Sequence, residues 1–458
     1  MERVDVFVIG GGGTGSEVAF RLGSRSGLRV AIAERDKLGG ECNHYGCVPT
    51  KVMLRSAKIA HLARDAGRFG VRIPSVEVDF RAVQQRARDV VEDQSAEGAA
   101  PFERAGITVH LQEARLVGER RVELADGTPV EADRIVLATG TEASVPPIAG
   151  LADGPVWTNR EAIWKPTRPP ASLAVIGTGA VGIEFSQIYA RFGSSVAAIE
   201  VLPQILPNED EEAAAALVPA LEAEGVRLLA GATVERAAHD GSGWRLSLAG
   251  GQTIEAEEVL VAAGRRPVFD GHDLAAAGVR LDDSGRPILT NTLRTTGDGV
   301  WAAGDATGDL LFTHVGSYEA AIVVDDILGA PRARDYRIVP RVTFCDPEVA
   351  SVGLTQRQAL EAGHRVRTAV VPLEDNERSH IDGRTVGLVK LVADAVTGEL
   401  LGGHIVGEEA GAMIHEVVAA MAARSPAAAV GDAIHAYPTL SESVKGAFER
   451  LAAGPEEG

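Results

Sequence analysis

Two cysteines in one short segment are the residues of this chain best suited to redox chemistry. Cys42 and Cys47 stand five positions apart in the run GGECNHYGCVPTK, which ends at Lys51. Five positions around a regular helix set two side chains about 140° apart, so a bond between these sulfurs requires an irregular turn, which Gly46 permits. A helix N-terminus and Lys51 would favour the thiolate, which is the reactive form of cysteine.

A metal site and a structural disulfide are the other interpretations of this pair. A zinc site needs further cysteines or histidines at ligand spacing, and the sequence offers no second pair of this kind, so we expect no metal. Only 3 cysteines in 458 residues do not form a secreted disulfide framework. They indicate a reducing, cytoplasmic compartment, where structural disulfides are rare. We expect Cys345, which has no neighbouring cysteine in the sequence, to be an ordinary buried residue.

Two glycine-rich turns form a diverged internal repeat. Each turn follows an apolar run that predicts a strand, opens a predicted helix, and is followed by a glutamate at the end of the next strand. Glycines let a pyrophosphate approach the backbone, the helix N-terminus offers N–H donors, and the acid binds ribose hydroxyls. The pattern therefore predicts two dinucleotide sites. Their residues are Gly10, Gly12, Gly15 and Glu34 in the first copy and Gly177, Gly179, Gly182 and Glu200 in the second.

The elements that must position these turns follow the same order in both copies. A strand, a helix and a second strand lead through short strands to a final apolar strand, which ends in a small-residue turn at Gly140 or Gly264. The first copy is longer by roughly residues 38–80, the segment that carries the cysteine pair. After Pro340 the chain changes to strands and an Ala-rich helix around 412–423, without a glycine turn, which predicts an α+β unit.

The composition excludes several classes of partner. Lys plus Arg is 45 and Asp plus Glu is 64, a net charge of −19, which disfavours nucleic acid and anionic membranes. No apolar run reaches the ~18 residues of a membrane helix, and the N-terminus is predicted to be a strand and not a signal peptide. Glu200 would repel the 2′-phosphate of NADP, and residues 201–226 contain no Lys or Arg to bind it, which favours NAD.

The sequence resembles, from end to end, the class I pyridine nucleotide–disulfide oxidoreductases, the family of dihydrolipoamide dehydrogenase, glutathione reductase and mercuric reductase. The resemblance includes both glycine turns and the Cys-x₄-Cys-Val-Pro-Thr-Lys run. It extends to Glu184 two positions after Gly182, Gly264-Arg-Arg-Pro267, Ala303-Gly-Asp305, Asp346-Pro-Glu348, Val352-Gly-Leu-Thr355 and Pro438-Thr-Leu-Ser-Glu442.

The family implies FAD on the first glycine turn and a pyridine nucleotide on the second. Electrons would pass from NADH through FAD to a Cys42–Cys47 disulfide, with Cys47 facing the flavin and Cys42 facing the substrate. Lys51 would lie near the flavin and pair with Glu184, and Asp305 would reach the ribityl and phosphate region. The further cofactor-binding residues that the family implies are Thr139, Gly140 and His314 on the FAD side and Gly264 on the nucleotide side.

We therefore predict an α/β fold with two Rossmann-like dinucleotide-binding domains, for FAD and NAD, and a C-terminal α+β dimerisation domain that forms a homodimer. The predicted domains are 1–147 for FAD with the redox cysteines, 148–269 for NAD, 270–335 for the second FAD part or central domain, and 336–458 for dimerisation. By analogy the C-terminal domain would complete the active site of the partner subunit.

One position departs from the family pattern. A histidine normally precedes the C-terminal Pro-Thr as acid/base, oriented by a glutamate five positions later. Here Tyr437 stands there, with Glu442 in place and His435 two residues upstream. A phenol with a pKa near 10 is ionised about one time in a thousand at pH 7. Tyr437 is then a poor base or a hydrogen-bond donor, His435 takes over, or the disulfide half-reaction has decayed in favour of quinones.

The predicted function is an NADH-using, FAD-dependent disulfide oxidoreductase whose small-molecule disulfide or dithiol substrate is not securely lipoamide. Mercuric reductase is disfavoured, because a paired-cysteine C-terminal tail and an N-terminal metal-binding domain are absent from this sequence. The Tyr-Pro-Thr pattern also resembles soluble transhydrogenases, which usually lack the second cysteine. The alternatives are an NADH:quinone or other-acceptor flavin reductase, and a non-catalytic subunit of a larger complex.

Overall fold

The computed structural model describes residues 2–25 and 27–454, which divide by their contacts into two compact units. The first unit holds the chain up to Val52 together with Gln84–Ser144 and Arg265–Asp335. The second unit holds Met53–Val83, Val145–Gly264 and the chain from Tyr336 onward. The predicted domain limits at 147, 269 and 335 stay predictions. Among the described residues, no helix is long and apolar enough to cross a membrane.

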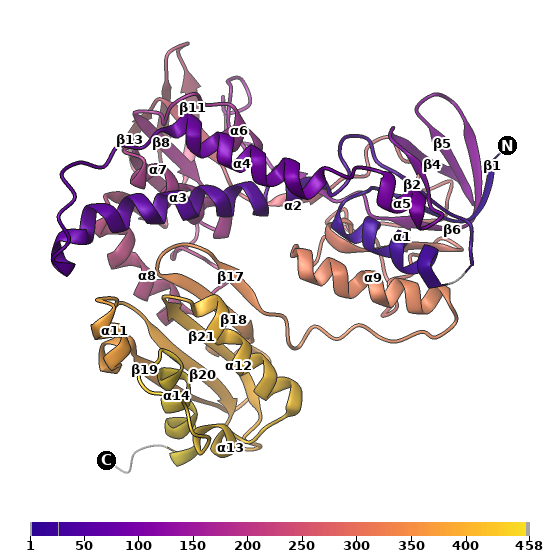
Figure 1. Cartoon of the computed structure of the whole chain (residues 1–458). Coiled ribbons are helices and arrows are strands. Elements are labelled where there is room, and N and C mark those ends of the chain that lie inside the picture. Colours follow the sequence, from indigo (N-terminus) through magenta and orange to yellow (C-terminus); the bar gives the residue numbers. More distant parts are fainter. Residues whose placement is uncertain (1, 26, 455–458) are drawn as a thin grey trace. The chain divides into compact units, whose positions relative to one another are not determined.

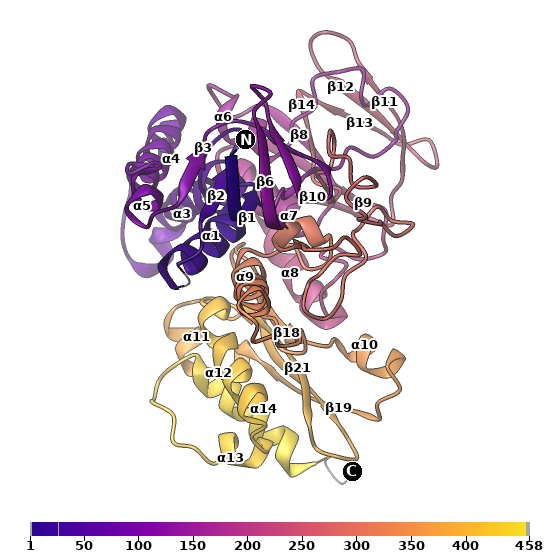
Figure 2. The same cartoon turned by 90° about the vertical axis from the view of Figure 1, so that its right-hand side faces the viewer.

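The first unit is built on a seven-stranded sheet with a parallel centre. The path runs β3-β2-β1-β6-β5-β4, and β16 pairs with β6. Helices α1 (Gly13–Arg25) and α9 (Thr313–Ile327) lie side by side against it (Figures 1 and 2). The strands are β1 (Glu2–Ile9), β2 (Val30–Ala33), β3 (Thr108–His110), β4 (Ala114–Gly118), β5 (Arg121–Leu124), β6 (Pro129–Leu137) and β16 (Val300–Ala302). The consecutive residues 6–9 of β1 are all buried, as expected for a parallel strand covered on both faces.

Helices fill the inserted segment of the first copy. They extend past the predicted limit at residue 80, since α4 and α5 follow before the chain re-enters the sheet at β3. The helices are α2 (Gly40–His44), α3 (Cys47–Asp65), the 3₁₀ helix η1 (Ala66–Phe69), α4 (Phe80–Ser95) and α5 (Ala100–Arg104). Helix α3 begins in the first unit and continues into the second, and α4 runs back into the first.

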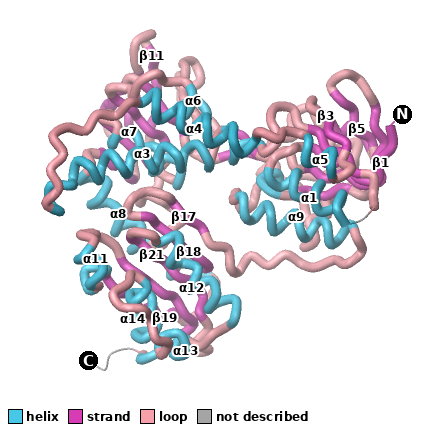
Figure 3. Tube along the Cα trace, viewed as in Figure 1, coloured by secondary structure: helices cyan, strands magenta, loops and turns pink. Residues whose placement is uncertain are grey.

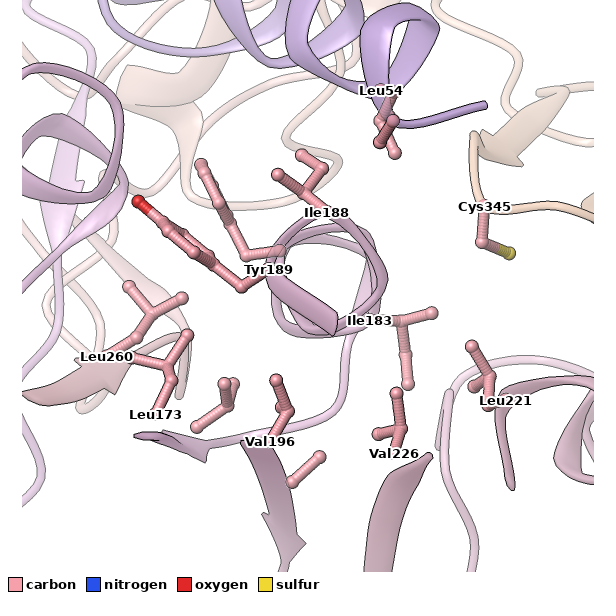
Figure 4. Packing of buried hydrophobic residues seen from close by; sticks show 14 of the residues in the cluster. Leu54, Leu173, Ile183, Ile188, Tyr189, Val196, Leu221, Val226, Leu260 and Cys345 are labelled. Carbon is pink, nitrogen blue, oxygen red and sulfur yellow. The ribbon is translucent and has the colours of Figure 1, made fainter. Parts of the chain in front are cut away.

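The second unit repeats the nucleotide-binding arrangement. Its parallel sheet has the order β10-β9-β8-β14 and carries a separate three-stranded antiparallel sheet. Its elements are β8 (Ser172–Ile176), α7 (Ala180–Arg191), β9 (Ser195–Glu200), α8 (Glu211–Ala223), β10 (Val226–Ala230), β11 (Val234–His239), β12 (Trp244–Leu248), β13 (Thr253–Ala256) and β14 (Glu258–Val261). Around α7, apolar side chains that include Ile183 and Tyr189 pack closely (Figure 4). The predicted burial of Cys345 is confirmed, because it lies in this cluster at 2% exposure.

The C-terminal part of the second unit is the predicted α+β structure. Its antiparallel sheet has the order β17-β18-β21-β20-β19, and helices α12 and α14 pack on it (Figures 2 and 3). The elements are β17 (Arg341–Thr343), β18 (Glu348–Gly353), β19 (Val366–Pro372), α11 (Glu377–Ile381), β20 (Leu388–Asp394), β21 (Leu400–Gly407), α12 (Ala410–Ala423) and α14 (Ser441–Ala453). Helix α14 buries Val444, Ala447, Phe448 and Leu451, which share one helical face. The predicted fold class is confirmed.

Buried charges connect the nucleotide-binding and C-terminal parts of the second unit. Lys390, which is 1% exposed, donates to Asp210 at 2.9 Å and to Glu212 at 2.8 Å. Arg341 donates to Glu209 at 2.8 Å. Removing one partner of a buried ion pair leaves a charge without compensation, so these pairs fix the position of the segment that precedes α8.

Candidate active site

The predicted irregular turn between the two cysteines is confirmed. Helix α2 carries Cys42 and ends at His44, whereas Cys47 is the first residue of α3. Pro49 lies in the first turn of α3, where the missing N–H of proline does not break a helical hydrogen bond. Cys42 is half-buried and Cys47 is exposed, and no disulfide joins the two sulfurs in the structure.

The segment in front of the cysteines is fastened to the first glycine turn. The Gly39 N–H donates to the Gly11 carbonyl at 2.8 Å. Gly40 has φ 61°, and a Cβ added there would lie 2.7 Å from the Gly12 Cα, which is inside van der Waals contact. Only glycine fits this approach, so the Gly39-Gly40 pair keeps Cys42 close to the first dinucleotide turn.

Thr313 lies between the two sulfurs. Its hydroxyl donates to the Cys42 Sγ at 3.2 Å and stands 3.9 Å from the Cys47 Sγ. The hydrogen bond with Cys47 and then burial raise the pKa of the Cys42 thiol, while Thr313 and Lys51 act in the opposite direction. No motif in the sequence marks Thr313, the first residue of α9, as a neighbour of a segment some 270 positions away.

Close packing around Thr14 positions the start of α9. A Cβ on Gly304 or on Gly316 would overlap the Thr14 side chain. Helix α9 and the turn before it therefore approach the first helix so closely that only glycine fits at these two positions. A Cβ on Gly13 would lie 3.9 Å from the Thr313 Cγ2. The first glycine turn therefore sets the position of Thr313 and, through Gly39, that of the cysteine segment.

The first glycine turn forms a cradle at the end of β1. Gly10 has φ 103°, and a side chain there would overlap the Ala138 carbonyl. The carboxylate of Glu34 accepts hydrogen bonds from the N–H groups of Gly11 and Asp36, each at 2.8 Å. The Thr139 hydroxyl is buried and has no hydrogen-bond partner among the described residues.

Asp305 lies beside this cradle in the 3₁₀ helix η2 (Gly304–Thr307). Burial raises the pKa of its carboxyl group, while the hydrogen bond from Thr141 and the charge of Arg265 oppose that shift. The Thr141 hydroxyl donates to Asp305 at 3.0 Å and accepts from the Arg265 Nε at 2.8 Å. The guanidinium group of Arg265, in the Gly-Arg-Arg-Pro motif, thus orients the Thr141 hydroxyl, which in turn donates to Asp305.

The second glycine turn has the same construction with an added hydroxyl. A Cβ on Gly182 would overlap the Gly177 carbonyl. Glu200, which is 6% exposed, accepts from the Thr178 N–H at 2.9 Å and from the Thr178 hydroxyl at 3.1 Å. It also accepts from the Leu202 N–H at 3.1 Å. The carboxylate is therefore held against the turn from both sides.

The other residues predicted for these two cradles lie on or beside the strands and helices that flank the cradles. Gly140 follows β6 with φ 72°, and Gly264 follows β14 with φ 119°. His314 is the second residue of α9, where its ring stacks on Phe312. Glu184 lies on α7 at 3% exposure and accepts from the Phe344 N–H at 2.9 Å. The pairing of Glu184 with Lys51 stays a prediction.

The structure gives the three predicted C-terminal residues three different partners. Tyr437 is 68% exposed, and a hydrogen bond to Glu377 raises the pKa of its phenol. His435 pairs with Glu416 at 2.8 Å; burial opposes protonation, but this hydrogen bond raises the pKa of the imidazole. Glu442 accepts from the Thr439 N–H at 3.0 Å.

A surface hollow of about 290 Å³ lies beside this segment, and Glu377 and Glu442 are both among its lining residues. The predicted orienting glutamate and the actual partner of Tyr437 thus face one hollow. Among the described residues, no group of three or more His, Cys, Asp or Glu side chains is placed to hold a metal ion.

Comparisons with known proteins agree with this arrangement. The model of the pyridine nucleotide-disulphide oxidoreductases matches residues 4–322, and that of their dimerisation domain matches residues 339–448. Dihydrolipoyl dehydrogenase of Chlorobaculum tepidum is 37% identical over 461 residues, which cover 98% of this chain and 97% of that protein. Mercuric reductase of Bacillus cereus is 32% identical over 446 residues, which cover 96% of this chain and 70% of that protein.

Solved structures give the same result. The HOCl-induced flavoprotein disulfide reductase RclA from Escherichia coli has a TM-score of 0.86 and 28% identity, with 97% of this chain and 99% of that chain covered. LpdA from Mycobacterium tuberculosis has a TM-score of 0.88 and 27% identity, with 98% and 100% covered. The chain is a flavoprotein disulfide oxidoreductase and belongs to the class I pyridine nucleotide–disulfide oxidoreductase family.

Proposed function

We propose that the protein uses NADH and FAD to reduce a Cys42–Cys47 disulfide, which in turn exchanges with a small-molecule disulfide or dithiol. The observation that carries this proposal is the placement of both cysteines beside the first glycine turn, joined to it by the Gly39 hydrogen bond and contacted by Thr313. A cysteine pair placed there has access to a dinucleotide cofactor and, because Cys47 is exposed, to solvent.

The first cradle suits FAD. The Thr139 hydroxyl is buried and has no partner within the described part of the chain, and a buried donor of this kind is ordinarily satisfied by a ligand or water. Glu34 accepts one backbone N–H on each oxygen, which leaves a lone pair on each for ribose hydroxyls. Asp305 and Gly140 complete the proposed set. When bound, FAD supplies a carrier that accepts a hydride from a nicotinamide and delivers two electrons to a disulfide.

The second cradle suits NADH better than NADPH. Three hydrogen bonds hold the Glu200 carboxylate in one orientation. A fixed negative charge binds the ribose hydroxyls of NAD and repels the 2′-phosphate of NADP. Glu200→Ala would remove this discrimination, and the ratio of the NADPH dissociation constant to the NADH dissociation constant would fall at least tenfold.

The two thiols would take different roles in the exchange. The thiolate of Cys42 attacks one sulfur of the substrate disulfide, a mixed disulfide forms, and the first substrate thiolate leaves and takes up a proton. The thiolate of Cys47 then attacks the Cys42 Sγ, which restores the Cys42–Cys47 disulfide and releases the second substrate sulfur. The substrate gains two electrons and two protons, and the cysteine pair is oxidised. The reverse sequence oxidises a dithiol.

Tyr437 is proposed as a hydrogen-bonding group and not as a base. Its hydrogen bond to Glu377 makes the phenolate still rarer at neutral pH. His435 pairs with Glu416 on α12, whereas Tyr437 contacts Glu377 and Glu442 accepts from Thr439. Because this chain lacks the usual base, the family resemblance alone does not assign lipoamide as the substrate. Tyr437→His would raise turnover of dithiols, and an unchanged rate would mean that proton transfer does not limit the reaction.

An NADH:quinone reductase is the second candidate. Tyr437 stands where the family has its acid/base, and its hydrogen bond to Glu377 raises the pKa of the phenol. This chain therefore lacks the group that assists thiol chemistry, which quinone reduction does not need. The family's dimerisation domain supports a homodimer, in which the Tyr437 segment would serve the partner's active site. A purely non-catalytic subunit of a complex is disfavoured, because both cradles and both cysteines are intact.

Turnover of the holoenzyme with lipoamide, glutathione disulfide and quinones would distinguish the candidates. We expect Cys42→Ser and Cys47→Ser to abolish NADH-dependent disulfide reduction while both variants keep their flavin. Cys345→Ser is the matched control, because this buried thiol is distant in sequence from the pair and should leave turnover unchanged. Full activity of the Cys47→Ser enzyme with quinones, combined with no disulfide reduction by the unaltered enzyme, would replace the first proposal by the second.

A further inference from the structure

The Thr313 hydroxyl is directed at the reacting sulfurs and serves no purpose in its own helix. Helix α9 starts at Thr313 after Phe312, and no side chain caps its N-terminus. The Thr313 hydroxyl donates to the Cys42 Sγ at 3.2 Å and lies 3.9 Å from the Cys47 Sγ. The shorter contact lies well within the range of a hydrogen bond to sulfur, which is a larger acceptor than oxygen.

The surroundings of the Cys42 thiol disfavour its thiolate, so a hydrogen-bond donor matters at this sulfur. Its hydrogen bond with Cys47 and its burial both raise the pKa of the Cys42 thiol, so the pair favours a proton on the sulfur that must attack the substrate. Thr313 and Lys51 lower that pKa. Tyr437 occupies the position of the base that is usual in the family. Its phenol is hydrogen-bonded to Glu377, which raises the pKa of the phenol.

The position of Thr313 is built into the fold. Thr14 packs where Cβ atoms on Gly304 and Gly316 would overlap it, so the start of α9 cannot move away from the first glycine turn without opening that packing. The same turn anchors the cysteine segment through Gly39 and Gly40. The hydroxyl and the sulfurs are therefore held by one rigid feature.

We propose that Thr313 is a third catalytic residue of the redox site, whose hydroxyl donates a hydrogen bond to the Cys42 Sγ and stabilises its attacking thiolate. This inference rests on the proposed function of the Cys42–Cys47 pair. In the step concerned, the reduced pair loses one proton from Cys42 to solvent, and no bond to Thr313 is made or broken. The Thr313 proton stays on its oxygen and is shared with the anionic sulfur.

The test is the pH dependence of alkylation of Cys42 in the full-length, flavin-loaded protein. A phosphine reduces the pair without nucleotide, iodoacetamide then traps thiolates between pH 5 and 10, and tandem mass spectrometry of the peptide containing residues 38–51 separates Cys42 from Cys47. A hydrogen bond to a charged group contributes about 1.5–3 kcal/mol, which is about a tenfold to hundredfold effect. Thr313→Val should therefore slow Cys42 alkylation at pH 7 by about tenfold or more.

Two further variants separate a catalytic from a merely structural role. Thr313→Ser keeps the hydroxyl and should restore alkylation of Cys42 to within about twofold of the unaltered protein. Thr313→Ala loses the hydroxyl without the extra methyl of valine and should behave as Thr313→Val does, so a folding defect of the valine variant leaves the test intact. Equal pH–rate curves of Cys42 in the unaltered, serine and alanine proteins would overturn the proposal.

The outcome is distinguishable from failure of the proposed function. Phosphine reduction produces the two thiols whether or not the flavin can reduce the disulfide. If NADH fails to produce thiols in the unaltered protein, the proposed function is wrong, while the effect of Thr313 on Cys42 is still measured. If NADH produces both thiols and the hydroxyl has no effect on Cys42, only the Thr313 inference is wrong.

Discussion

The first glycine turn, at Gly10–Gly15, and the second, at Gly177–Gly182, hold their acids in the same way. Glu34 accepts the N–H of Gly11 and that of a residue two positions after itself, and Glu200 accepts the equivalent two N–H groups from Thr178 and Leu202. In both turns the last glycine stands where a Cβ would overlap the carbonyl of the first. Two copies that have diverged in sequence have therefore kept one backbone geometry.

The hydroxyl groups around these turns differ. The first turn has Gly11, where a Cβ would lie 2.8 Å from the Leu38 Cδ2, and the second has Thr178, fully buried and bonded to Glu200. The small-residue turn that closes the first copy has Thr139, whose hydroxyl has no partner in residues 2–25 and 27–454, and the corresponding turn of the second copy has Ala263. The first cradle keeps a polar group for a ligand, and the second uses its hydroxyl to fix the acid.

The support of the two turns also differs. The first is packed by α9 and the cysteine segment of its own unit. The second is connected to the C-terminal sheet, since the Leu206 N–H donates to the Thr178 carbonyl and the Ser351 hydroxyl donates to Glu209 at 2.6 Å. The first cradle is thus connected to the cysteine segment and the second to the buried charges of the second unit. The following predictions test this division, beginning with the largest effect.

Matched glycine substitutions should separate the two cradles. Gly15→Ala and Gly182→Ala each place a Cβ on a backbone oxygen, and overpacking of this kind costs about 1–3 kcal/mol or more, a loss of roughly five- to 150-fold in binding. We expect Gly15→Ala to be purified with little flavin. Gly182→Ala should keep its flavin absorbance and be reduced by NADH only at far higher NADH concentration. Loss of flavin from both variants would contradict the division.

Acid should weaken the second unit through His404. Burial lowers the pKa of His404 from 6.5 to about 4, and its ring contacts the Ser351 that donates to Glu209. Between these two pKa values the unfolded chain binds a proton that the native protein excludes. The stabilisation is therefore complete above pH 6.5 and is lost as the pH falls toward 4, by up to about 3 kcal/mol.

Urea unfolding between pH 7.5 and 4.5 would measure this contribution. His404→Gln removes the titrating group, so the free energy of unfolding should fall less steeply with acid in the variant than in the unaltered protein. NADH affinity should follow the unfolding curve, while flavin retention should not. Identical slopes for the two proteins would show that His404 does not carry this pH dependence.

Thr178→Val should weaken only the second cradle. The substitution keeps the shape of the side chain and removes a donor to a buried carboxylate, which contributes about 1.5–3 kcal/mol. Thr178→Ser is the matched control. We expect a higher dissociation constant for NADH, a smaller preference over NADPH, and unchanged flavin content. Unaltered discrimination between the two nucleotides would mean that the backbone N–H groups alone orient Glu200.

Thr139→Val should have the smallest effect, and it should change stability and flavin affinity in different directions. Its hydroxyl has no partner among the described residues, so the flavin-free variant should be as stable as the parent or slightly more stable. The flavin dissociation constant should rise about fivefold, as one neutral hydrogen bond of about 1 kcal/mol is lost. Comparing thermal unfolding with and without flavin would measure both. A destabilised flavin-free protein would indicate that the hydroxyl serves the fold instead.

Periodicity and short-range spacing predicted much of this structure. The strands, both helices after the glycine turns and the C-terminal α+β unit follow from apolar runs bounded by glycine and proline, which are local signals. The break between Cys42 and Cys47 is expected only if the two sulfurs form a bond, because a regular helix would set them about 140° apart. Thr313, Thr141 and Glu377 could not be found in this way, because each reaches its partner through packing of distant segments. The partner of Tyr437 is the clearest case: the sequence pointed to Glu442, and the hydrogen bond goes to Glu377.

Anaerobic titration with NADH tests the central claim most directly. If Cys47 accepts electrons beside the flavin, stoichiometric NADH should produce a long-wavelength absorption band from thiolate-to-flavin charge transfer, together with two new thiols per subunit. Cys47→Ser should lose the band, and Thr313→Ser should keep it. If NADH only bleached the flavin and no thiols appeared, the Cys42–Cys47 pair would not be the redox centre of this protein.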